Sequence, residues 1–252
     1  MEIPDYLIDF HRIARRQGPG SDASTRRALG AVPNVAGVET ILDLGCGTGR
    51  QTLVLAHETD AQITAVDILR PFLDELEIRA AAEGVAERIT TREASMDDLG
   101  LDGRSFDLVW SEGSAYTVGV ENALRHWRDL VAPGGAVVVS DLCWLTDSRP
   151  GEIEDFWAQG YPDITTINGR LRSFEPAGYE CTTHFVLPPE GWTDEYYTPI
   201  RERSPDFLRA HGGDADVAVF LDSGLEEARL YDQYGDYYSY VYFVLRPRDP
   251  QS

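Results

Sequence analysis

The chain has 252 residues, of which 42% are hydrophobic, and it carries a formal net charge of -21 at pH 7. Such an acidic surface repels phosphate backbones, which argues against nucleic-acid binding. All 22 basic residues are arginine, which excludes a Schiff-base lysine, a P-loop lysine and a lysine general base.

The N-terminal residues 1–37 are predicted to form helices separated by the segment RQGPGS, residues 16–21. The glycines and the proline of this segment do not fit inside a stable helix. Ser21 or Asp22 is expected to cap the helix that follows.

From residue 39 onward, strand patterns alternate with helix patterns. The predicted strands cover 39–44, 63–68, 88–93, 106–110, 136–141, 179–188 and 237–247, and the predicted helices cover 50–58, 69–84, 119–135, 152–160, 167–178 and a stretch near 215–229. Short connections between alternating elements predict an α/β fold with a Rossmann-like, doubly wound sheet of seven strands, mostly parallel with the last strand antiparallel.

We expect a single domain over residues 1–252, and no linker composition divides it. Its expected parts are a helical lid (1–37), a cofactor-binding core (38–145) and a final part (146–252) that covers the acceptor and supplies the last two strands.

The compartment and the absence of metal are further expectations. No apolar run reaches the roughly 18 residues of a membrane-spanning helix, and the N-terminus lacks the apolar stretch of a signal peptide. Cys46, Cys143 and Cys181 are too far apart for a CxxC metal site, and the histidines show no ligand spacing. We therefore expect a cytoplasmic protein without membrane contact or bound metal, and we leave a homodimer open.

A glycine-rich segment, ILDLGCGTGR, joins the first strand to the next helix. Gly45, Gly47 and Gly49 follow the spacing GxGxG, and glycine lets the backbone approach a ligand closely. The dinucleotide fingerprint GxGxxG requires glycine where Arg50 stands. Asp43 precedes the loop and is a candidate to hold the ammonium group of an amino-acid moiety.

Residues at the ends of the next two strands suggest the rest of this ligand. Asp67 ends the second strand, where a carboxylate accepts hydrogen bonds from both ribose hydroxyls, and Ile68 beside it is a further candidate contact. Ser95 is a candidate to read the adenine edge, and Met96 to pack on the adenine face. An amino acid at the first strand and a ribose at the second describe S-adenosylmethionine (SAM) rather than NAD.

At these residues the sequence resembles the class I SAM-dependent methyltransferases. DLGCGTG matches their first motif, AVD their second, and the VAPGG turn before the fifth strand is another recurring feature. The resemblance covers residues 36–145 and is nearest to the small-molecule enzymes of ubiquinone and menaquinone biosynthesis.

The resemblance implies a role for each matching residue. The acid and the first two glycines of DLGCGTG would contact the methionine part of SAM, Asp67 the ribose, and Ser95 with Met96 the adenine. Many relatives carry an acid at the position of Ser95, so we expect a weaker or mainly backbone contact to adenine here.

The segment WSEGSAY follows the fourth strand and carries two catalytic candidates. Glu112 is expected to hold or deprotonate the substrate, or to hydrogen-bond the methionine end of the cofactor. The structural alternative is a helix cap or a partner for an arginine. Tyr116 is a candidate to orient the nucleophile or stack on it, with core packing as the alternative.

The segment RQGPGS is the candidate lid over the cofactor. Its backbone N–H groups would suit the cofactor's carboxylate, with Arg16 as counter-charge and Gln17 as hydrogen-bond donor. Ser21 is included among the cofactor contacts, and a simple turn between two helices is the alternative.

The region after the fifth strand is expected to cover the acceptor. His184, on the sixth strand, is a third catalytic candidate. An aromatic-walled pocket, suited to a flat or cationic small molecule, is predicted from Trp144, Trp157, Trp192, Tyr196 and Tyr197.

The sequence thus predicts methyl transfer from SAM to an oxygen or nitrogen of a small-molecule acceptor by in-line displacement. A C-methyltransferase of the quinone-biosynthesis type is the first alternative. A SAM-binding regulatory protein without turnover is the second.

Overall fold

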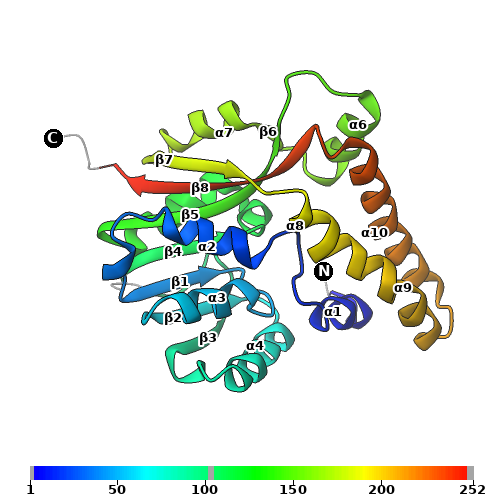
Figure 1. Ribbon diagram of the computed structural model, residues 1–252, viewed down its shortest axis with the longest axis horizontal. Helices are drawn as coiled ribbons and strands as arrows, with labels where there is room; N and C mark the ends of the chain where they lie inside the picture. The colour runs from blue at the N-terminus through cyan, green and yellow to red at the C-terminus, as the bar shows by residue number, and fades with distance from the viewer. Residues whose placement is uncertain (1–2, 102–104, 249–252) are drawn as a thin grey trace.

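A mixed sheet forms the centre of the protein (Figure 1). The computed structural model describes residues 3–101 and 105–248, so the ends and residues 102–104 of the expected domain lie outside the described residues. The strands are β1 (Thr40–Leu44), β2 (Gln62–Asp67), β3 (Ile89–Glu93), β4 (Phe106–Glu112), β5 (Val131–Trp144), β6 (Thr165–Thr166), β7 (Tyr179–Val186) and β8 (Tyr238–Pro247).

The strand order is β3-β2-β1-β4-β5-β8-β7, with the short β6 paired to β5 outside this path. Strands β1 to β5 pair in parallel, whereas β8 runs antiparallel to both β5 and β7. The predicted fold is therefore confirmed, including the reversed direction of the last strand.

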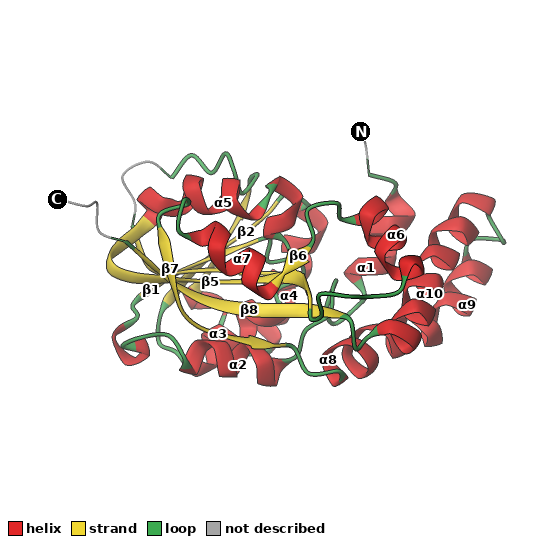
Figure 2. Ribbon diagram, turned by 90° about the horizontal axis from the view of Figure 1, so that it is seen from above, coloured by secondary structure: helices red, strands yellow, loops and turns green. Residues whose placement is uncertain are grey.

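Helices cover both faces of the sheet. They are α1 (Asp5–Arg12), α2 (Asp22–Gly30), α3 (Arg50–Glu58), α4 (Arg70–Ala82), α5 (Val120–Trp127), α6 (Gly151–Gly160), α7 (Ile167–Phe174), α8 (Glu190–Trp192), α9 (Thr198–Ala210) and α10 (Ala215–Tyr234). Helices α2 and α3 lie on one face, and α5 and α7 on the other (Figure 2). Helices α1, α9 and α10 extend past the carboxyl ends of the parallel strands (Figure 1).

The burial of β1 and the first turn of α4 agree with the hydrophobic pattern and the proline position in the sequence. Residues 41–44 of β1 are all buried, as expected for a strand covered on both faces. In α4, Pro71 occupies the first turn, where its missing N–H costs nothing, and its buried residues are Phe72, Leu73, Leu76 and Ala80.

One predicted helix is wrong at its end. The helix predicted over 119–135 stops at Trp127, and β5 already begins at Val131. The Pro133–Gly135 turn lies inside this long strand, at a register shift between β4 and β5, with Gly134 at φ +80. Pro and Gly here mark a bulge at a strand end rather than a helix terminus.

The sequence pattern also missed helix α9. The preceding aromatic stretch continues through a π-helical turn, Thr193–Tyr197, into α9, which contains Pro205. Proline disfavours a helix interior, but α9 packs on α10, and this tertiary contact overrides the local preference.

The break between the first two helices is confirmed. Helix α1 ends at Arg12, α2 begins at Asp22, and the Ser21 side chain caps α2 by accepting a hydrogen bond from the Ser24 backbone N–H. Across residues 3–101 and 105–248, no helix combines the length and the apolar character needed to cross a membrane.

Candidate functional site

A cavity of about 940 Å³ lies at the carboxyl edge of the sheet. It reaches the upper end of the roughly 300–1,000 Å³ usual for small-molecule sites. Most of the candidate residues line it, namely Gln17, Gly45, Gly47, Asp67, Ile68, Ser95, Met96, Glu112 and Tyr116. The structure does not bring Ser21, Asp43 and His184 to its wall.

The glycine loop forms a cradle that side chains would fill. Gly45 has φ +70, and a Cβ there would lie 2.3 Å from the Ser114 hydroxyl oxygen. Gly47 has φ +56, and its Cβ would lie 2.3 Å from the amide oxygen of Gln17. Because only glycine fits both the backbone conformation and the space, the loop presents bare backbone to the cavity, as the methionine part of SAM requires.

Asp67 stands at the end of β2, beside the loop. Its carboxylate accepts hydrogen bonds from the backbone N–H groups of Gly47 and Leu69, both at 2.9 Å. Burial raises the pKa of Asp67, while these N–H groups oppose that rise. Ile68, 58% exposed, extends the same wall. A fixed carboxylate facing the cavity fits the predicted contact to ribose, and that role stays a prediction.

Asp43 lies behind the loop rather than in the cavity. Its side chain is fully buried and accepts a hydrogen bond from the Thr52 hydroxyl at 2.6 Å. Burial raises the pKa of Asp43 to about 7, although the Thr52 bond opposes the rise. Gln51, which lines the cavity, donates to the Cys46 carbonyl and reaches Asp43 at 3.5 Å. Asp43 would therefore act on a ligand through Gln51 and the glycine loop rather than by direct contact.

The adenine candidates lie at the β3 side of the cavity. Ser95 hydrogen-bonds Asp97, so its hydroxyl is engaged within its own loop. Met96 is 9% exposed, and the Trp127 indole N–H donates to its carbonyl at 2.9 Å. Met96 is thus a fixed apolar wall, as packing on a base requires.

Glu112 accepts hydrogen bonds from four side chains. Thr25 and Trp110 donate to Oε1 at 2.8 and 3.1 Å, and Arg16 and Tyr242 donate to Oε2 at 3.1 and 2.9 Å. Its side chain is only 6% exposed. A carboxylate has about four acceptor positions, so little capacity remains for a substrate proton. The geometry favours the arginine-partner alternative, in which Glu112 joins the N-terminal segment to the sheet.

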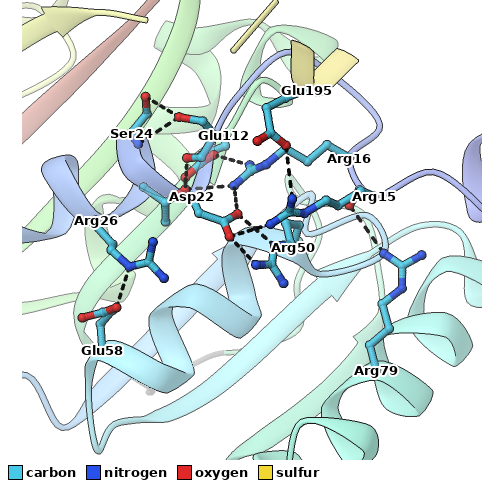
Figure 3. A network of polar contacts seen from close by, with 12 residues as sticks. Arg15, Arg16, Asp22, Ser24, Arg26, Arg50, Glu58, Arg79, Glu112 and Glu195 are labelled. Carbon is cyan, nitrogen blue, oxygen red and sulfur yellow. Dashed lines mark hydrogen bonds and ion pairs between the residues drawn. The ribbon is translucent and has the colours of Figure 1, made fainter. Parts of the chain in front are cut away.

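Asp22 extends this network toward the glycine loop (Figure 3). It pairs with Arg15, Arg16 and Arg50, the last of which follows Gly49 directly. These arginines hold the pKa of Asp22 well below its usual range, although burial works in the opposite direction. The start of α2 is thereby anchored to the start of α3.

Gln17 binds the glycine loop directly. Its amide nitrogen donates to the Thr48 hydroxyl, and its amide oxygen accepts from the Thr48 backbone N–H, both at 2.9 Å. The same nitrogen donates to the His11 carbonyl at 3.0 Å. The segment between α1 and α2 therefore covers the loop. Ser21, the cap of α2, lines a smaller neighbouring pocket instead.

Aromatic rings form the other end of the cavity. Trp192 is stacked on Tyr240 with centroids 5.3 Å apart, and Tyr116 lies 5.4 Å from Tyr161. The aromatic residues at this end are Tyr116, Phe156, Trp157, Tyr161, Trp192, Tyr196 and Tyr240. Of the predicted aromatic pocket, Trp144 and Tyr197 lie in the core instead.

Sequence reasoning missed Glu227, Tyr161 and Tyr240 in this wall. Tyr161 is held by a buried pair, since its hydroxyl donates to Asp141 at 3.0 Å and Asp141 pairs with Arg170 at 2.8 Å. Burial raises the pKa of Asp141 to about 6 despite the arginine. No local motif marks these positions, because they lie on separate elements.

His184 is not part of this wall. It lies on the edge strand β7, exposed, with its ring stacked on Phe243 at 6.0 Å. Within residues 3–101 and 105–248, no three His, Cys, Asp or Glu residues form a group that could hold a metal.

Comparison with known proteins agrees with this geometry. Residues 41–135 match the family model described as a methyltransferase domain. A 27-O-demethylrifamycin SV methyltransferase from Amycolatopsis mediterranei is 28% identical over 75% of this chain and 74% of its own length. A sarcosine/dimethylglycine N-methyltransferase from Halorhodospira halochloris is 26% identical over 66% of this chain, which spans 63% of that protein.

A solved structure shares the fold over the whole length. The SAM-dependent methyltransferase from Geobacter sulfurreducens, in complex with S-adenosylhomocysteine, superposes with a TM-score of 0.78 at 21% identity, covering 98% of this chain and 99% of its own. The strand order, the glycine cradle and the methyltransferase domain matched over residues 41–135 support a class I SAM-dependent methyltransferase, and the solved structure shows that the fold of the whole chain is the same.

Proposed function

We propose that this enzyme transfers the methyl group of SAM to an oxygen or nitrogen atom of a small molecule. One observation carries the proposal: a single cavity joins the glycine cradle and Asp67 to an aromatic end whose wall comes mostly from the second half of the chain. Such a cavity has room for a cofactor and an acceptor together.

The cofactor end would bind and orient SAM. Gly45 and Gly47 would meet its methionine part, Asp67 would accept from the ribose hydroxyls, and Met96 would pack on adenine. SAM supplies an activated methyl group that leaves its sulfur by in-line displacement. The covering segment, fixed through Gln17, would exclude water from that path.

The acceptor end would hold the nucleophile in line with the methyl group. Tyr116, at the start of the segment that follows β4, is 40% exposed and faces this end. Burial raises the pKa of the Tyr116 hydroxyl, so it would act as a hydrogen-bond donor that orients the acceptor. The names of relatives that methylate oxygen or nitrogen support this choice of atom, whereas a C-methyl product is the alternative.

Product analysis tests the proposal. The protein is incubated with SAM carrying a ¹³C-labelled methyl group and a panel of phenols, alcohols and amines, and S-adenosylhomocysteine is measured by mass spectrometry. We expect S-adenosylhomocysteine to form only with acceptor present and the label to appear as an O-methyl or N-methyl carbon signal. A C-methyl signal, or SAM binding without acceptor-dependent turnover, would contradict the proposal.

A further inference from the structure

We propose that the acceptor is a small organic cation and that Glu227 is the counter-charge of its ammonium group: either an amine, which loses an N–H proton to water before its nitrogen is methylated, or a quaternary ammonium compound, which is methylated on a hydroxyl oxygen whose proton goes to water. This inference rests on the proposed function and assigns a binding residue and a substrate class to the aromatic end of the cavity. Glu227 lies on α10 and lines the cavity with Tyr196 and Tyr240.

Of the charged side chains in the cavity wall, one arginine and one glutamate pair with each other, and the other two acids have no cationic partner among the described residues. Among the residues that the structure describes, the charged side chains in the wall are Arg16, Asp67, Glu112 and Glu227. Arg16 and Glu112 neutralise each other at 3.1 Å. Asp67 receives two backbone N–H groups at the end where ribose would bind.

Among residues 3–101 and 105–248, one side chain donates a hydrogen bond to Glu227. The Tyr197 hydroxyl donates to its Oε1 at 2.9 Å, and no arginine of the described residues lies within ion-pair distance. Burial raises the pKa of Glu227, and only the Tyr197 bond opposes it. A half-buried carboxylate without a counter-charge is unfavourable. A cation in the cavity would remove that cost.

The rings beside Glu227 suit the same ligand. Burial raises the pKa of the Tyr196 hydroxyl first, and the nearby Glu227 carboxylate raises it further, as it also does for Tyr116 and Tyr240. The Glu227 carboxylate thus contributes to the raised pKa of three tyrosine hydroxyls in the cavity wall. Tyrosine and tryptophan faces attract cations, and the Trp192–Tyr240 stack presents such a surface.

The molecule as a whole also favours a cation. The net charge of -21 attracts positively charged small molecules and repels anions. Neither a lysine nor an unpaired arginine of the described residues lines the cavity to receive an acidic acceptor.

Binding of matched probes tests the inference independently of turnover. With S-adenosylhomocysteine bound, calorimetry compares choline with its uncharged isostere 3,3-dimethylbutan-1-ol, and 2-phenylethylamine with 2-phenylethanol. We expect the cation to bind about tenfold more tightly than its neutral counterpart in at least one pair, from cation–π and charge pairing. Glu227→Gln should reduce this preference to about twofold or less while S-adenosylhomocysteine affinity stays unchanged.

Glu226→Gln is the matched control, because Glu226 is the exposed neighbour on the same helix and pairs with Arg229. It should keep the full preference. No preference in either pair, or a preference that survives Glu227→Gln, overturns the inference. Weaker binding of SAM but not of S-adenosylhomocysteine in Glu227→Gln would also overturn it, because Glu227 would then face the sulfonium. Failure of S-adenosylhomocysteine itself to bind would instead refute the proposed function.

Discussion

The two ends of the cavity are built in different ways. At the cofactor end, the wall is a glycine loop and strand ends, and Asp67 is fixed by backbone N–H groups. At the acceptor end, the wall is side chains from separate helices and β8, and Glu227 has one hydroxyl donor. Backbone walls suit a ligand shared by a whole family, whereas side-chain walls change with the acceptor.

The largest effect is expected at Glu112, which joins the N-terminal segment to the sheet. Glu112→Gln removes the charge that faces Arg16, which leaves a buried guanidinium without its main partner. We expect the free energy of unfolding to fall by about 3 kcal/mol, measured by denaturant titration. Glu93→Gln, an exposed acid at the end of β3, should change it little. Unchanged stability together with lost turnover in Glu112→Gln would instead support the catalytic role.

At the cofactor end, Asp67→Ala should weaken S-adenosylhomocysteine binding by about thirtyfold, because the loss of charged hydrogen bonds to ribose costs about 2 kcal/mol. Calorimetry measures the affinity, and Asp60→Ala, just before the same strand, is the control. Equal affinities of the two variants would show that Asp67 does not hold the ribose.

Asp43 should make cofactor binding depend on pH. With its pKa raised to about 7 by burial, the carboxyl is half protonated at neutral pH. An ammonium group bound nearby favours the carboxylate, so Asp43 should release up to roughly half a proton at pH 7 when SAM binds. Calorimetry in buffers of different ionisation enthalpy measures this release. Asp43→Asn should abolish it, and the same release in that variant would remove Asp43 from the assignment.

The raised pKa of Asp43 also predicts how the stability of the fold changes with pH. Because the folded pKa of Asp43 lies above its unfolded value of 3.8, its protonated form stabilises the fold at low pH. That contribution is lost as the pH rises from about 4 to about 7. The free energy of unfolding of Asp43→Asn should therefore vary less over this range than that of the unmodified protein.

The smallest effect is expected outside both ends. His184 is exposed on the edge strand and does not line the cavity. His184→Ala should change kcat/KM by less than about twofold and the free energy of unfolding by less than about 0.5 kcal/mol, as for other surface substitutions. A loss of kcat above about tenfold would restore His184 as a catalytic candidate. It would also imply that β7 approaches the cavity when the ligands are bound.

The sequence predicted the cofactor end better than the acceptor end, for a physical reason. Gly45 and Gly47 share one short motif, and Asp67 follows at the end of the adjacent strand, so local pattern and sheet order bring them together. Tyr161 and Glu227 have no such relation. Their meeting depends on how α6 and α10 pack past the sheet edge, which alternation of polar and apolar residues does not encode.

Packing also decided where the fold departed from the pattern. Pro205 inside α9 and the Pro133–Gly135 turn inside β5 contradict local preference. In both cases neighbouring elements, α10 and β4, supply the contacts that outweigh it. Similarly, the four donors around Glu112 come from distant segments, so the choice among its alternatives required the structure.

The covering segment is attached at several points at once, and this sets how ligands exchange. Gln17 holds it to Thr48, Arg16 holds it to Glu112, and the Gly20 N–H donates to the Gly191 carbonyl at 3.1 Å. Because breaking one attachment frees little backbone, we expect cofactor entry and product departure to require the whole segment to detach in one cooperative event. The amide hydrogens of Thr48 and Gly20 should consequently show the same protection factor against exchange with solvent, and S-adenosylhomocysteine should raise both protection factors by the same factor.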